Sequence, residues 1–165
     1  AYTVNPVHGG GKGSAMLSAN CVADAVIEAL EVGDPSAEAL WRANVCYMHN
    51  YGVKQGVLNV FRLFLQELSD EDLEFGMRRR IIREEDLNVL SLRGDLELSV
   101  VEKAMRVLAG LTRPSLLLKL RVVSEYMNRA RSLYEAYPSH PRDLPRWTQE
   151  VESLMREYRA RLGIS

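Results

Sequence analysis

The chain has 165 residues, of which 47% are hydrophobic and 26% are charged, and its net charge is −1. This mixture is typical of a globular domain and excludes an intrinsically disordered chain. No apolar run reaches the roughly 20 residues that cross a bilayer, and the near-zero net charge argues against a nucleic-acid partner.

The sequence does not open with a basic segment followed by an apolar one, so no signal peptide is predicted. We therefore expect a cytoplasmic protein whose contact with membranes is at most peripheral. The segment 114–165 carries nine basic and six acidic residues. This mildly cationic composition suits either an anionic surface or a solvated face.

A loop is predicted over residues 1–13, because this segment contains Gly9, Gly10, Gly11 and Gly13. A helix is expected to begin near Gly11–Ser14 and to end before Gly33. Its packed face is predicted to consist of the apolar residues Met16, Leu17, Ala19, Ala23, Val26, Ile27 and Leu30.

A second, longer helix is predicted after the pair Asp34-Pro35, with Asp34 as the N-cap and Pro35 as the first helical residue. It extends to about Leu68, and Gly52 and Gly56 mark a bend or close packing inside it. The two helices form an antiparallel hairpin over residues 14–68.

Further helices are predicted in the region 69–165. Ser69 caps a helix with an acidic first turn, and short helices follow between residues 76 and 98. Another helix is expected over 99–111.

Two proline-containing segments mark the last two helices. The pair Arg113-Pro114 opens a long helix, and Asp143 caps the final one. No strand-like alternation is present. The predicted fold class is therefore all-α, with a glycine-rich loop (1–13), a helical hairpin (14–68) and a C-terminal helical region (69–165).

The glycine loop is the segment with recognisable chemistry. It fails as a Walker A loop at Pro6 and Gly13, and as a dinucleotide fingerprint at Ser14. A glycine loop that leads into a helix still exposes backbone N–H groups at the positive end of the helix dipole. That arrangement suits an anion or a polarised carbonyl. A connector without a ligand is the alternative.

The stretch Ala1-Tyr-Thr-Val-Asn-Pro-Val-His-Gly-Gly-Gly-Lys-Gly-Ser-Ala-Met-Leu-Ser18 resembles a signature of the geranylgeranyl reductase family. These flavoproteins are related to the p-hydroxybenzoate-hydroxylase type of FAD enzyme. In the family, the glycines and the following helix N-terminus face the flavin ring. The resemblance implies that FAD is contacted by Asn5, Pro6, Gly9, Gly10, Gly11, Lys12 and Gly13.

The resemblance also implies a reaction, the reduction of isolated double bonds in isoprenoid chains such as the geranylgeranyl groups of ether lipids. Backbone N–H groups around Gly11 and Lys12 would stabilise negative charge on the reduced flavin. The Lys12 side chain either adds to this effect or points to solvent. His8 either contacts flavin, as a proton source, or has a structural hydrogen bond. No catalytic residue is assigned.

The sequence departs from the family pattern in ways that suggest a longer parent protein. The family's Gly-Asp pair, its Rossmann-like half and its strand-rich region have no counterpart, and Tyr2 and Lys12 replace Gly and Ile. We expect a C-terminal part whose partners are an N-terminal FAD-binding half and a prenyl-lipid substrate, and which by itself is inactive and lacks FAD. The alternative is a free-standing helical scaffold or interaction module.

Other candidate sites are weaker. Arg78–Arg80 lies beside acidic residues, so a solvated helix with ion pairs is favoured over a lipid-phosphate site. Trp41, Tyr47 and Tyr51 fit either core packing or an isoprenoid groove. The spacing of His and Cys fits no metal site, so no metal is predicted.

The two cysteines, Cys21 and Cys46, lie equally far from the predicted turn at Gly33 and Asp34. In an antiparallel hairpin such residues are level along the helix axes. Axes about 8–10 Å apart allow the Cα separation of about 4.4–6.8 Å that a disulfide needs. A disulfide and two buried thiols both fit this position, although cytosolic disulfides are uncommon.

Overall fold

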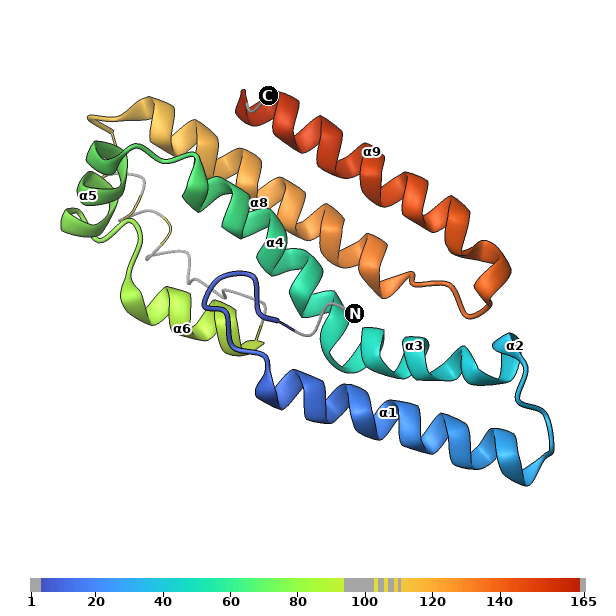
Figure 1. Ribbon diagram of the computed structural model, residues 1–165. Coiled ribbons are helices and arrows are strands. Elements are labelled where there is room, and N and C mark those ends of the chain that lie inside the picture. Colours follow the sequence, from blue (N-terminus) through green and yellow to red (C-terminus); the bar gives the residue numbers. More distant parts are fainter. Residues whose placement is uncertain (1–3, 94–102, 104–105, 107–108, 110, 164–165) are drawn as a thin grey trace.

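The computed structural model describes residues 4–93, 103, 106, 109 and 111–163. These residues form helices, turns and loops and contain no strand, so the predicted all-α class is confirmed. Figure 1 shows the elements, which are α1 (Lys12–Glu31), α2 (Ala37–Leu40), α3 (Arg42–Tyr47), η1 (Met48–Gly52), α4 (Val53–Gln66), α5 (Asp70–Arg78), α6 (Glu84–Arg93), α8 (Pro114–Glu135), η2 (Pro141–Asp143) and α9 (Leu144–Leu162).

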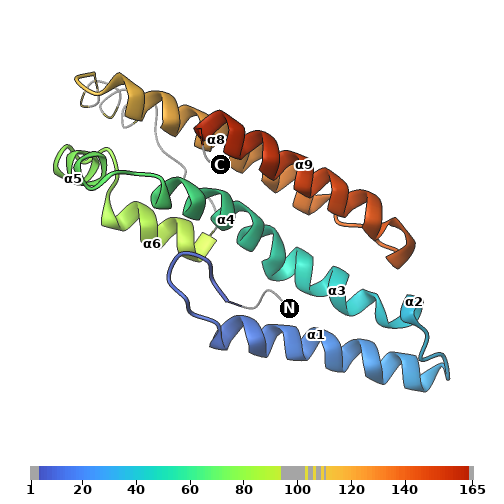
Figure 2. The same ribbon diagram turned by 45° about the horizontal axis from the view of Figure 1, so that its top comes forward.

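The predicted hairpin is present, with α1 lying alongside α2 and α3 in both views (Figures 1 and 2). Its second arm starts later than predicted. Ser36, and not Asp34, is the N-cap, because the Ser36 hydroxyl accepts a hydrogen bond from the Ala39 N–H at 3.2 Å. The Asp34 carboxylate instead accepts one from the Ser36 N–H at 3.1 Å, so it orders the turn before the helix.

The single helix predicted up to about Leu68 is interrupted. A π-helical turn, η1, separates α3 from α4 and ends at the buried Gly52. A Cβ atom on Gly52 would collide with Met48, and one on Gly56 would lie 2.6 Å from the ring of Tyr134. Both glycines therefore allow close packing, which is one of the two explanations, a bend or close packing, that were predicted for them.

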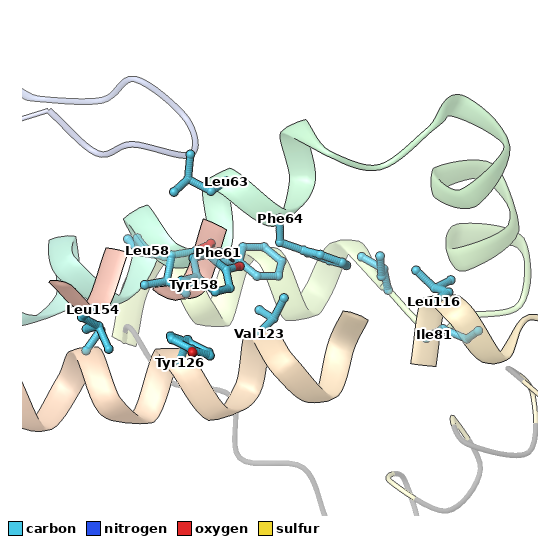
Figure 3. Close-up of a cluster of buried hydrophobic side chains, with 13 residues drawn as sticks. Leu58, Phe61, Leu63, Phe64, Ile81, Leu116, Val123, Tyr126, Leu154 and Tyr158 are labelled. Atoms are coloured by element: carbon cyan, nitrogen blue, oxygen red, sulfur yellow. Dashed lines mark hydrogen bonds between the residues drawn. The ribbon is translucent and has the colours of Figure 1, made fainter. Parts of the chain in front are cut away.

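The hydrophobic core lies where α4, α8 and α9 pack against each other (Figures 1 and 3). The labelled side chains of Figure 3 come from these three helices and from the segment after α5. Tyr158 of α9 is fully buried, and its hydroxyl donates a hydrogen bond to the Val60 carbonyl of α4 at 2.9 Å. This bond ties α9 to α4 and satisfies a buried phenol.

The segment after α4 follows the predicted capping pattern. The Ser69 hydroxyl accepts a hydrogen bond from the Asp72 N–H at 3.2 Å, so Ser69 is the N-cap of α5. Arg106 and Asp86 form a largely buried ion pair, with Nη1 to Oδ2 at 2.6 Å. The end of the region of short helices predicted between residues 76 and 98, and most of the helix predicted over 99–111, lie outside the described residues.

The helices α8 and α9 begin close to the prolines from which their starts were predicted. Pro114 is the first residue of α8, after Arg113 as N-cap. Asp143 occupies the N-cap position of α9, but its side chain makes no capping hydrogen bond, so this part of the prediction is wrong. Pro145 lies in the first turn, where a missing N–H costs no helical hydrogen bond.

The packed face predicted for α1 is wrong. The buried residues of this helix are Ser14, Cys21, Ala25 and Ala29. The larger apolar residues form an exposed stripe on another face, which we call the α1 stripe and which comprises Met16, Val22, Val26, Ile27 and Leu30. Small side chains face α3 because the two helices are close, as the disulfide described below requires.

Candidate functional site

The glycine loop is held by hydrogen bonds of its own. Asn5 is 1% exposed, and its Oδ1 accepts hydrogen bonds from the N–H groups of Val7 at 2.9 Å and His8 at 3.3 Å. Its backbone N–H donates to the Gly10 carbonyl at 2.8 Å, and the Gly9 N–H donates to the Asn5 carbonyl at 2.9 Å. Asn5 therefore organises the loop from its centre.

The glycines of this loop occupy their positions for different structural reasons. Gly9 has a φ of +73°, a conformation that residues with a Cβ rarely adopt. A Cβ on Gly10 would lie 2.6 Å from the His8 ring. Gly13 is helical, and a Cβ there would meet no atom within 4 Å. Since neither backbone nor packing requires Gly13, its lack of a side chain leaves the first turn of α1 open to another molecule.

The N-terminus of α1 presents backbone donors. Gly11 is the N-cap and offers no side chain, and its carbonyl accepts from the Ala15 N–H at 2.9 Å. The N–H groups of Lys12 and Gly13 belong to the first turn, where no intrahelical acceptor exists. Both residues are exposed, so these donors lie at the surface at the positive end of the dipole.

His8 and Lys12 are both exposed. The His8 ring is exposed, and its Nδ1 accepts a hydrogen bond from the Gly10 N–H at 3.0 Å. This is the structural hydrogen bond that was the predicted alternative to a flavin contact. Lys12 is exposed, so its side chain lies toward solvent in this chain.

The isoalloxazine ring of FAD has a polar edge with carbonyl oxygens, and the loop fits such a group. Open space at Gly13 permits close approach of a flat ring to the main chain. The N–H groups of Lys12 and Gly13 are donors of the kind that a polarised carbonyl or an anionic ring would accept from. The Asn5 side chain is buried inside the loop, so only the backbone of this residue could reach such a group.

A disulfide joins Cys21 of α1 to Cys46 of α3, with a Cα–Cα distance of 5.8 Å. The sequence fitted either a disulfide or two buried thiols, and the structure contains the disulfide. It fixes α1 in position along α3 and so helps to hold the N-terminus of α1, where the glycine loop ends.

The arginine run and the aromatic group have mostly structural surroundings. Arg78 pairs with Glu74 on the exposed face of α5, as the ion-pair interpretation predicts. Trp41 stacks on Tyr137 with ring centroids 5.7 Å apart, and its Nε1 donates to the Pro138 carbonyl at 2.9 Å. Tyr47 also lines a cavity, and burial together with the neighbouring Tyr51 raises its pKa.

That cavity contains a residue that the sequence did not single out. Gln55 lies among the core residues of α4, is 3% exposed and lines the cavity wall. Neither its Nε2 nor its Oε1 has a hydrogen-bond partner. The available signal was an amide within a strongly apolar segment, three residues before Leu58.

Among the described residues, no group of three or more His, Cys, Asp or Glu side chains is placed to hold a metal ion. None of the helices described combines the length and apolar character needed to cross a membrane.

The similarity extends beyond residues 1–18 to nearly the whole chain. The chain is 53% identical over 162 residues to a digeranylgeranylglycerophospholipid reductase of Sulfolobus acidocaldarius. The match covers 98% of this chain and 36% of the relative, so the chain spans about a third of that protein's length. No protein-family model matches the chain.

Proposed function

We propose that the chain is the C-terminal helical part of an FAD-dependent reductase that saturates isoprenoid double bonds of prenyl lipids. The observation that carries this proposal is the 53% identity to a digeranylgeranylglycerophospholipid reductase along 98% of the chain. The open N-terminus of α1, which follows the glycine loop directly, supports it independently.

In this proposal the first turn of α1 holds the polar edge of the flavin. FAD, when bound, supplies the electrons for the reduction. The N–H groups of Lys12 and Gly13 donate hydrogen bonds to that edge, and the helix dipole favours negative charge there. The loop around Asn5 positions the first turn, and the Cys21–Cys46 disulfide holds α1 against α3.

The α1 stripe supports a longer functional protein. Leu30 is 68% exposed, Ile27 is 55% exposed, and Met16 and Val22 of the same stripe are also exposed. Contiguous exposed apolar surface of this kind is typical of an interface. We propose that the FAD-binding half covers the stripe, and that the chain alone binds no FAD and has no activity. We further propose that the enzyme is cytoplasmic and that a prenyl-lipid substrate brings it into peripheral contact with membranes.

The proposal is tested with a chimera in which this chain replaces the matching region of the Sulfolobus relative. The purified chimera is expected to be yellow and to reduce a geranylgeranyl lipid with a chemical reductant present. The separate chain is expected to show no flavin absorbance. A chain that retains stoichiometric FAD alone, or a folded chimera without flavin and activity, would contradict the proposal.

The role of the α1 N-terminus is tested in the same chimera with Gly13→Glu. A carboxylate in the open first turn blocks approach and repels negative charge, so FAD retention is expected to fall at least about tenfold, since each 1.4 kcal/mol is a factor of ten. The matched control is Gln149→Glu, which adds the same carboxylate at an exposed site on α9. Equal flavin content in the two variants would exclude the proposed contact.

A further inference from the structure

A cavity of about 470 Å³ lies between the α1–α3 hairpin and the helices α4, α8 and α9. This volume falls within the range of small-molecule sites, about 300–1,000 Å³. Residues 4–13 do not contribute to its wall, so the cavity is separate from the loop that we propose to contact FAD.

The wall selects against charged molecules. None of the described residues that line it is charged, and much of it is aromatic, formed by Tyr47, Tyr134, Tyr137 and Trp147. Met48 and Met155 add flexible apolar side chains that adapt to irregular shapes. A phosphate or carboxylate would be left unpaired there, which is strongly unfavourable.

Gln55 gives the wall a single unsatisfied amide. It is 3% exposed, and neither polar atom has a hydrogen-bond partner. Tyr47 is near, since the Gln55 amide opposes the rise in its pKa, but the two groups fall short of hydrogen-bond geometry. Buried amides in native proteins are normally satisfied, so this one calls for a partner.

We propose that the cavity binds an uncharged hydrocarbon alcohol whose hydroxyl pairs with Gln55. One hydroxyl donates to Oε1 and accepts from Nε2, so it satisfies both atoms. The amide turns toward the cavity by rotation of its own side chain. The hydrocarbon part then lies against the rings and methionines. This inference does not rest on the proposed function, because it concerns binding to the chain alone.

Binding is measured by fluorescence of the 165-residue chain with farnesol as the probe, below its aggregation concentration. Both tryptophans report on the site, because Trp147 lines the cavity and Trp41 stacks on the lining residue Tyr137. We expect a saturable change with farnesol and at least tenfold weaker binding of farnesyl phosphate. Absence of a saturable change, or tighter binding of the phosphate, would overturn the proposal.

The variant Gln55→Leu tests the amide. We expect about tenfold weaker farnesol binding together with a higher melting temperature, because an unsatisfied buried amide has been removed. Gln149→Leu, the same substitution at an exposed position of α9, is expected to bind as the original chain does. Unchanged affinity in Gln55→Leu would contradict the assigned hydroxyl partner.

A filling variant, Ala43→Phe, keeps the test decisive if Gln55→Leu does not fold. Ala43 lies on the wall in α3, so a phenyl group there occupies the cavity. We expect loss of saturable farnesol binding with an unchanged helical circular dichroism spectrum. Retained binding in this folded variant would place the ligand elsewhere and overturn the proposal.

Discussion

The helices α1 and α4 use their apolar side chains in opposite ways. In α4 the large residues Leu58, Phe61 and Phe64 are buried against α8 and α9. In α1 the small residues are buried, and the large ones, such as Met16 and Leu30, are exposed. The comparison teaches that α4 stabilises this chain, whereas the apolar side of α1 is available to another surface.

The largest expected effect separates the two helices directly. Phe64→Ala empties a fully buried site in α4 and should lower the free energy of unfolding by about 3–5 kcal/mol. Ile27→Ala on the α1 stripe should change it by less than about 0.5 kcal/mol, because Ile27 is exposed. Urea unfolding of both variants measures the difference. Similar losses in the two would refute the comparison.

Reduction of the Cys21–Cys46 disulfide should affect α1 far more than α4. The bond closes a loop with a sequence separation of 25, which corresponds to about 3.5 kcal/mol in the chain-entropy estimate. Amide hydrogen exchange should accelerate in α1 and α3 after reduction and stay slow in α4 and α8. Uniform acceleration along the chain would show that the hairpin and the core unfold together.

Tyr158→Phe tests the tie between α9 and α4. The Val60 carbonyl loses its buried donor, so the free energy of unfolding should fall by about 1–2 kcal/mol. Burial also raises the pKa of Tyr158 above its ordinary value of 10.0. The folded state therefore binds a proton that the unfolded state releases above about pH 10, and stability decreases as the pH rises beyond that value.

The variant provides its own control for this pH dependence. Phenylalanine cannot ionise, so the alkaline loss of stability should be smaller in Tyr158→Phe than in the original chain. Urea unfolding at about pH 8 and about pH 11, which lie on either side of the ordinary tyrosine pKa, measures the stability of both proteins. Parallel curves would mean that other groups cause the alkaline loss.

Gly13→Ala should separate stability from function at the start of α1. A Cβ there meets open space, so the better helix propensity of Ala should raise the free energy of unfolding by up to about 1 kcal/mol. In the chimera the same change should reduce FAD retention. A stabilised variant with full flavin content would show that Gly13 is not at a contact.

Ile27→Glu should have the smallest effect on the chain and a clear effect on the chimera. The exposed position tolerates a charge in the separate chain, with a change below about 0.5 kcal/mol. In the chimera a carboxylate at a covered interface should lower the soluble, flavin-containing yield. Gln149→Glu serves as the matched control. An equal yield for both variants would show that the FAD-binding half does not cover the α1 stripe.

Local sequence signals determined many element boundaries. Ser69 caps α5, and Pro114 begins α8, because both effects depend on neighbouring residues alone. The glycine loop could also be predicted from the sequence. So could the placement of Cys21 and Cys46 at the same height along the two hairpin helices, since it follows from chain geometry around one turn. The FAD contacts of the loop stay a prediction.

Tertiary structure decided which faces are buried and where the long helix is interrupted. Hydrophobic spacing identified the apolar side of α1 but could not show that α3 packs on its small residues. The π-helical turn before Gly52 and the close fit of Gly56 under Tyr134 depend on helices distant in sequence. Likewise, the isolation of the Gln55 amide arises only when helices distant in sequence surround one cavity. Burial depends on every segment that packs around a residue, so periodicity within one helix cannot determine it.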